Sequence, residues 1–190
     1  MKNSLFSFLL SALLLLGCNE TPIQPEEPVV QSAESGESYE LIQMPTKPAG
    51  TPTFSATETI DGSKGGQINI NEHFVTEDGD TVTIIVKLKV EKECFSGNVD
   101  ITMTVDDVYT AVMFTPEMVF NKPVELDVKY KGLNPDQLIL TSGNYEFLYI
   151  DDNGNTETVP SNGVVVKQEI GQISVKKAKL SHFSRYAFIR

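Results

Sequence analysis

Strict alternation of apolar and polar residues is the feature that most limits what this chain can fold into. Apolar side chains occupy every second position in three segments, 82–90, 99–105 and 124–130. A period of two places successive side chains on opposite faces of a strand, so each segment is expected to bury one face and expose the other. No segment of ten residues keeps the period of 3.6 that is typical of an amphipathic helix.

Turn-forming dipeptides separate these segments. They are Asp61-Gly62, Gly65-Gly66, Asp78-Gly79, Asn134-Pro135, Asn153-Gly154 and Asn162-Gly163. Short alternating strands divided by such turns favour antiparallel pairing in two packed layers. The sequence therefore predicts an all-β fold, an antiparallel β-sandwich.

The first 18 residues have the pattern of a bacterial lipoprotein signal. Lys2 supplies the positive charge, residues 5–16 are mostly apolar, and Leu15-Leu16-Gly17-Cys18 reads as a lipobox. The apolar run is shorter than the ~20 residues that span a bilayer, which indicates a cleaved signal peptide (1–17) and not a membrane anchor. Cys18 is the predicted lipidation site; the alternative is an ordinary secretory signal with a chance cysteine.

Charge and acylation together set the expected location and partners. Loss of Lys2 with the signal peptide leaves 14 basic and 26 acidic side chains, so the whole surface disfavours nucleic acid and anionic headgroups as partners. Two or more acyl chains hold a protein on a membrane without a spanning helix. We expect a lipid-anchored protein of the bacterial cell envelope, at the outer membrane or cell surface more than at the inner membrane.

The segment after Cys18 differs in composition from the rest. Six of the ten prolines lie between residues 19 and 52, among glutamates and small polar residues. Such a segment buries too little apolar surface to offset its chain entropy. The sequence predicts a disordered linker over 18–52, with no strand at 39–42, followed by one folded domain over 53–190.

Four segments within 54–190 resemble the ZU-five domain, a β-sandwich of ankyrins and netrin receptors with bacterial exported relatives. They are Phe114-Thr115-Pro116-Glu117, the stretch 120–126, the Gly65-Gly66 step, and the closing stretch 180–187. The resemblance implies an interaction module and not an enzyme. Spectrin binding does not carry over, because the chain has no recognisable basic contact surface.

His182-Phe183-Ser184 is the sharpest candidate for chemistry. In some eukaryotic relatives of the ZU-five family, which this chain resembles, a His-Phe-Ser triplet at this place cleaves itself between Phe and Ser. A histidine two residues before a serine can accept its hydroxyl proton, and the oxygen then attacks the preceding carbonyl. The alternative is a closing strand whose Phe183 fills the core; we predict this and an intact Phe183–Ser184 bond.

Asp151, Asn153 and Asn155 place oxygen atoms at alternate positions, as a calcium loop does. An EF-hand loop needs glycine at its sixth position and glutamate at its twelfth, where this chain has Thr156 and Asn162. The Asn-Gly pair instead suits a tight hairpin turn. We predict a hairpin here and no metal site.

Tyr145, Phe147 and Tyr149 share one face of a predicted strand. Exposed rings in a row would form a platform for sugars. Leu148 and Ile150 make the other face apolar too, which is typical of a strand covered on both sides. Core packing is the prediction, and carbohydrate binding is the alternative.

Catalysis has little support elsewhere. With Cys18 committed to lipid, Cys94 is left without a disulfide partner, and no histidine lies near it in sequence. His73 and His182 are the only histidines, too few for a histidine-rich zinc site. We expect no cofactor and a non-catalytic sandwich that binds an envelope protein or polysaccharide; the alternatives are carbohydrate binding and self-cleavage at Phe183–Ser184.

Overall fold

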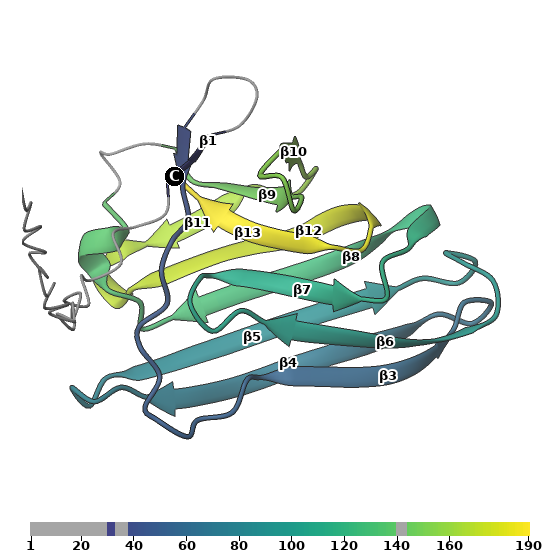
Figure 1. Cartoon of the computed structure of the whole chain (residues 1–190). Coiled ribbons are helices and arrows are strands. Elements are labelled where there is room, and N and C mark those ends of the chain that lie inside the picture. Colours follow the sequence, from purple (N-terminus) through teal and green to yellow (C-terminus); the bar gives the residue numbers. More distant parts are fainter. Residues whose placement is uncertain (1–29, 33–37, 140–143) are drawn as a thin grey trace, which may run out of the picture.

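The computed structural model describes residues 30–32, 38–139 and 144–190, and strands dominate it (Figure 1). In chain order the strands are β1 (Val30–Ser32), β2 (Ser38–Glu40), β3 (Ser55–Asp61), β4 (Gly66–Val75), β5 (Thr81–Val90), β6 (Asn98–Val105), β7 (Ala111–Thr115), β8 (Val119–Lys131), β9 (Glu146–Ile150), β10 (Thr156–Thr158), β11 (Val164–Lys167), β12 (Gln172–His182) and β13 (Arg185–Ile189). Two 3-10 helices are described, η1 (Pro135–Gln137) and η2 (Gln168–Ile170). The three alternating segments lie in β5, β6 and β8, as predicted.

Two antiparallel sheets pack against each other, which confirms the predicted all-β sandwich. The six-stranded sheet has the order β10-β9-β13-β7-β6-β3, and the five-stranded sheet has the order β11-β12-β8-β5-β4. Strands β1 and β2 pair separately. The 13 residues of β8 run the length of the sandwich, about 40 Å at ~3.3 Å per residue.

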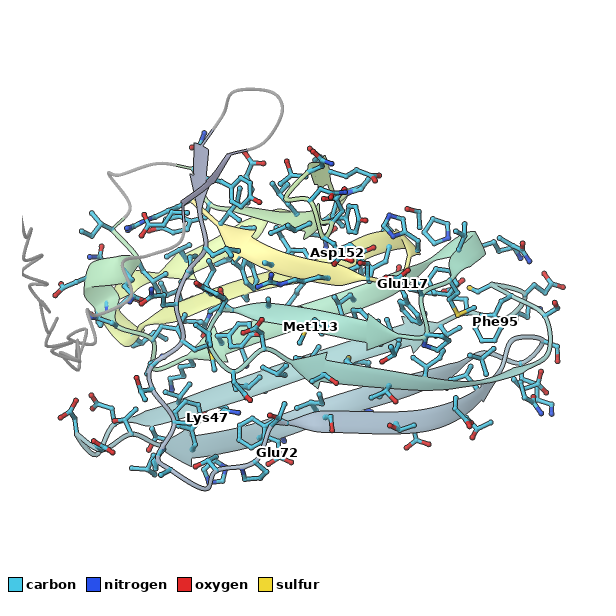
Figure 2. All side chains as sticks on the ribbon, in the orientation of Figure 1. Lys47, Glu72, Phe95, Met113, Glu117 and Asp152 are labelled. Atoms are coloured by element: carbon cyan, nitrogen blue, oxygen red, sulfur yellow. The ribbon has the colours of Figure 1, made fainter. Side chains whose placement is uncertain are left out.

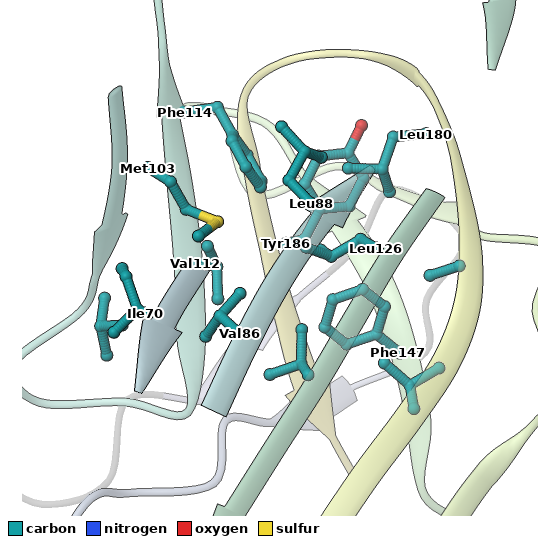
Figure 3. Packing of buried hydrophobic residues seen from close by; sticks show 14 of the residues in the cluster. Ile70, Val86, Leu88, Met103, Val112, Phe114, Leu126, Phe147, Leu180 and Tyr186 are labelled. Carbon is teal, nitrogen blue, oxygen red and sulfur yellow. The ribbon is translucent and has the colours of Figure 1, made fainter. Parts of the chain in front are cut away.

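The main core lies between the two sheets. In β5, Val82, Ile84, Val86, Leu88 and Val90 are all buried while the intervening residues are half-buried or exposed. Figure 3 shows side chains of this core, including Val86 and Leu126 from the five-stranded sheet and Met103 and Tyr186 from the other. Each fully buried aliphatic side chain contributes about 1.5–3 kcal/mol, so the alternation seen in the sequence is the main source of stability.

Tyr130 of β8 shows how the core accommodates a polar group. Its side chain is fully buried, and its hydroxyl donates a hydrogen bond of 3.0 Å to the Ala111 carbonyl. Ala111 begins β7 in the opposite sheet, so this bond joins the two layers. Burial raises the pKa of Tyr130, which keeps the hydroxyl neutral.

The segment 39–44 packs onto the sandwich, which corrects the prediction of a disordered linker extending to residue 52. Tyr39, Leu41, Ile42 and Met44 are buried. The expectation of no strand at 39–42 is also wrong, because β2 covers residues 38–40 and Leu41 pairs with Ile189 of β13. Prolines and glutamates on either side hid this short apolar stretch in the average composition.

A second, smaller cluster lies on the outer face of the six-stranded sheet. It consists of Tyr39, Leu41, Ala111, Leu148, Ile150, Ala187 and Ile189. The segment 39–41 therefore covers the side of β9 and β13 that faces away from the main core. This explains why β9 is apolar on both faces, as the sequence predicted.

The chain crosses from one sheet to the other at Phe183 and Ser184, between β12 and β13. Phe183 lies in the main core with Tyr186 and Phe188, on the same side as these two residues, because the crossing interrupts the strand. Residues 185–189 form the predicted closing strand.

Cys18, the signal peptide and most of the predicted linker lie outside the described residues. Within the described part of the chain, no helix is long and apolar enough to cross a membrane.

Candidate functional site: a depression at one end of the sandwich

The structure brings two of the sequence-predicted sites together at one end of the sandwich. Tyr149 of β9 and the corner residues His182, Phe183 and Ser184 line a shallow depression of about 290 Å³. The turn between β7 and β8 contributes Glu117 and Met118, and β8 contributes its first residue, Val119. Figure 2 shows Glu117 and Phe95 at this end, while Lys47 lies toward the other.

The corner at 183–184 lines the depression and is held by contacts from neighbouring strands. The Phe183 amide donates to the Met118 carbonyl at 2.8 Å, and the Phe114 amide donates to the Ser184 carbonyl at 3.0 Å. The Phe183 ring stacks on Phe114 with centroids 4.6 Å apart and meets Phe120 edge-on at 4.6 Å. Backbone hydrogen bonds and aromatic packing therefore hold the peptide between Phe183 and Ser184 in place.

His182 lies between aromatic rings. Its ring meets that of Tyr149 edge-on, with centroids 4.5 Å apart, and its Nε2 lies 3.6 Å from Glu157 Oε2. The Tyr186 hydroxyl donates to the His182 carbonyl at 2.6 Å. Burial raises the pKa of Tyr186, so this hydroxyl stays a donor.

The described geometry offers little for the self-cleavage chemistry. Among the described residues, His182 forms no hydrogen bond to Ser184, and positive φ outside glycine occurs at Glu93 and Lys177 alone. Neither residue flanks the Phe183–Ser184 bond. Positive φ, one form of backbone strain, is therefore not found at this corner.

Val119 is the most exposed large apolar residue described, at 78%. It begins β8, next to half-buried Met118 and buried Phe120. Sequence reasoning missed Met118 and Val119 as site residues, although a signal was available. Three apolar residues in succession cannot all face the core in a strand of period two, so one of them must face solvent.

The aromatic strand does not offer three rings to solvent. Phe147 is buried, and Tyr145 and Tyr149 are half-buried against the main core. The Tyr145 hydroxyl donates to the Gln137 and Ile139 carbonyls. Tyr149 is the member of this strand that reaches the depression.

Residues 151–155 form the predicted hairpin turn between β9 and β10. Asp151 Oδ1 accepts hydrogen bonds from the Asn153 and Asn155 amides, and Oδ2 accepts one from the Asn155 side chain. These bonds, chiefly that from the Asn155 side chain, hold the pKa of Asp151 below its usual range. The carboxylate is thus occupied within its own turn. The described residues contain no group of three or more His, Cys, Asp or Glu placed to hold a metal.

Cys94 is fully buried in the main core, and no disulfide involves it. Burial raises the pKa of its thiol and so lowers its nucleophilic thiolate fraction. His73 is exposed on β4 and His182 lies at the end of β12.

A larger hollow of about 900 Å³ lies at the other end of the sandwich and was not predicted. Its walls come from residues 43–46, the β4–β5 turn, residues 132–137 and the end of η2. Glu77, Asp78 and Asp80 on the turn give this hollow an acidic rim. It lies beside the segment through which the chain joins the sandwich.

No known protein family, curated protein or solved structure matches this chain.

Proposed function

We propose that this protein is a lipid-anchored, non-catalytic binding protein of the bacterial envelope, whose sandwich holds a protein or polymer partner. Cys18 carries the lipid in this proposal, and the ZU-five-like interpretation of the domain belongs to it. The observation that carries it is the apolar surface of Val119 and Met118 beside Tyr149 and His182, at the end of the sandwich away from the anchor side.

The path of the chain supports a binding surface at the end of the sandwich that lies away from residues 39–44. The Glu40 and Arg190 backbones pair at the end of β13, whereas Ser184 precedes its other end. Nineteen residues lie between Cys18 and Ser38, and even a fully extended chain across that interval spans at most about 70 Å. Packing of 39–44 on the domain shortens the reach expected from a linker that ends at residue 52. The depression therefore lies at the opposite end of β13 from the pairing of Glu40 with Arg190.

The carbohydrate alternative rests on a row of three exposed rings. The burial of Phe147 weighs against that alternative, and Tyr149 alone offers a ring to the depression. An exposed aliphatic side chain beside one aromatic and one imidazole ring fits a protein contact better than a sugar-stacking platform.

The experiment compares two exposed valines at opposite ends. Full-length protein carrying Val119→Glu is solubilised from envelopes after chemical cross-linking, beside the wild type and a matched Val75→Glu control; Val75 is 49% exposed at the end of β4. We expect wild type and Val75→Glu to capture the same cross-linked partner and Val119→Glu to lose it. Equal capture by all three proteins would refute a binding role for this end.

The anchor is tested separately. Metabolic labelling with palmitate should mark the wild type and leave a Cys18→Ala variant unlabelled. Undiminished label on the variant would overturn the lipoprotein part of the proposal and leave the binding part standing.

A further inference from the structure

Lysine is distributed very unequally between the two sheets. The six strands of the six-stranded sheet contain no lysine. In the five-stranded sheet, six lysines occupy positions that alternate with the buried residues and therefore share its outer face: Lys87 and Lys89 on β5, Lys129 and Lys131 on β8, Lys167 on β11, and Lys179 on β12. We call this surface the lysine face.

Strand register sets these side chains in rows across the sheet. Lys89 pairs with Glu125, which pairs on its other side with Lys179, and Lys87 pairs with Asp127. The Lys179 ammonium bonds to Glu125 and lowers the pKa of that carboxyl, and Asp127 Oδ1 accepts the Lys177 amide at 2.8 Å. Glu91, just beyond β5, bonds to Lys89 at 2.9 Å and adds a third carboxylate to Glu125 and Asp127. The six lysines still outnumber these three carboxylates, so the charge of this face is positive.

The excess charge lies in the rows that have no carboxylate. Lys129 pairs with Ile85 and Ser174, and Lys131 pairs with Thr83. Within the described residues, Lys87, Lys129, Lys131 and Lys167 form no ion pair. Adjacent outward positions are about 7 Å apart along a strand and about 5 Å apart across strands, so these cations form a patch and not a single site.

We propose that the lysine face binds an extended anionic polysaccharide that carries carboxylate groups. Lysine ammonium groups on flexible stems act as point charges and suit carboxylates in varied orientations. Gln67, Asn69 and Asn71 of edge strand β4 expose amide side chains next to Lys89, Lys87 and Ile85, where they can hydrogen-bond sugar hydroxyls. This proposal concerns a different surface from the depression and does not depend on its partner.

Two other polyanions fit this face less well. Nucleic acid is bound by arginine forks and by aromatic rings that stack on bases, and the outward positions of β4, β5, β8, β11 and β12 hold neither arginine nor an aromatic ring apart from His73. A membrane surface is the second. Tyr39 and Leu41 pack on the outer face of the opposite sheet, so the segment that enters the domain lies away from the lysine face.

The overall charge of −11 does not contradict this proposal. Screening limits charge interactions to roughly 8 Å at physiological ionic strength, so a bound polymer responds mainly to the face it touches. Salt also screens the attraction between the lysines and the polymer's carboxylates, so binding should weaken as the salt concentration rises.

The test uses full-length protein in nonionic detergent, captured on a biosensor, with polygalacturonate as the probe and dextran as the neutral polymer. We expect binding of polygalacturonate that weakens with salt, and none of dextran. Lys87→Gln, Lys129→Gln and Lys131→Gln together should weaken it roughly tenfold or more. The control, Lys64→Gln, Lys92→Gln and Lys122→Gln, removes three lysines outside the outward positions that define this face, two in turns and one near the start of β8, and should bind like the wild type.

Equal losses in the two triple variants would overturn the proposal, because net charge alone would then govern binding. So would absence of polygalacturonate binding. Binding to duplex DNA that is tighter than binding to polygalacturonate would assign the face to nucleic acid and refute the polysaccharide. Binding to phosphatidylglycerol micelles that is tighter than binding to phosphatidylcholine micelles would assign it to anionic lipid and refute the polysaccharide as well. None of these outcomes affects the Val119 experiment, so the two proposals fail independently.

Discussion

Glu40 and Arg190 are joined through both their backbones and their side chains, although 150 positions separate them. Each amide donates to the other carbonyl at 3.0 Å, and the guanidinium Nη2 and Nε lie 2.7 and 2.8 Å from Glu40 Oε2. This pair joins the end of β2 to the end of β13, beside the bridge between Leu41 and Ile189. The residues that precede the sandwich are therefore part of its fold.

Leu41→Ala should lower the free energy of unfolding by about 2–5 kcal/mol, because Leu41 is 2% exposed and its loss leaves a cavity over β13. Urea denaturation followed by circular dichroism measures this change. Glu58→Ala on exposed β3 is the control and should stay within about 0.5 kcal/mol of the wild type. A Leu41→Ala protein as stable as the control would mean that the segment 39–44 is dispensable to the fold.

Alternation made the sandwich predictable, because each strand carries its own period-two pattern. The segment 39–44 escaped prediction for the opposite reason. Its strand is short, and its burial depends on β9 and β13, which lie more than 100 residues later. No local pattern in an acidic, proline-rich stretch reveals a partner that distant.

The surfaces were harder to predict than the core. The lysine face needs β5, β8, β12 and β11 to be neighbours, and this order is not the order of the chain. The depression likewise joins the β7–β8 turn to the β12–β13 corner. His182 and Tyr149 were each identified from sequence, but their contact follows from strand order.

Gly171→Ala should be more harmful than Gly163→Ala, although both glycines have positive φ. An added Cβ at Gly171 would lie 2.0 Å from the Leu133 carbonyl oxygen, whereas at Gly163 it would meet nothing within 4 Å. Backbone strain alone costs about 1–2 kcal/mol, and the clash adds about 1–3 kcal/mol more. Thermal melting of both variants tests this; equal shifts in Tm would show that the approach of η2 to Leu133 is not rigid.

Asp61 should make stability depend on pH in the acid range. The Lys64 ammonium, followed by the Ser63 hydroxyl and amide, lowers the pKa of Asp61 to about 2 from an ordinary 3.8. A carboxyl with a depressed pKa in the folded state stabilises the protein above its unfolded pKa, and this contribution is lost as the pH falls through the folded value.

The stability difference between wild type and Asp61→Asn should therefore be full near neutral pH and should shrink between about pH 4 and pH 2. Urea denaturation at several pH values measures it. Lys64→Met removes the largest cause of the lowered pKa, so the pKa of Asp61 in this variant should lie closer to the ordinary 3.8. A difference that is constant down to the lowest pH would contradict the assigned pKa.

The Phe183–Ser184 bond should stay intact. Phe183 is 2% exposed, stacks on Phe114 and is held by the Met118 carbonyl, so cleavage would separate β13 from a packed corner. Loss of residues 182–190 would remove Phe183, Tyr186 and Phe188 from the core. Each large buried aromatic contributes about 3–5 kcal/mol, so the truncated chain should not fold, given a total stability of about 5–15 kcal/mol.

Intact-mass spectrometry of the denatured protein tests whether the Phe183–Ser184 bond is cut. It should show one uncut species, identical in pattern for Ser184→Ala. A released peptide of residues 184–190, absent from Ser184→Ala, would instead establish self-cleavage with His182 as the base.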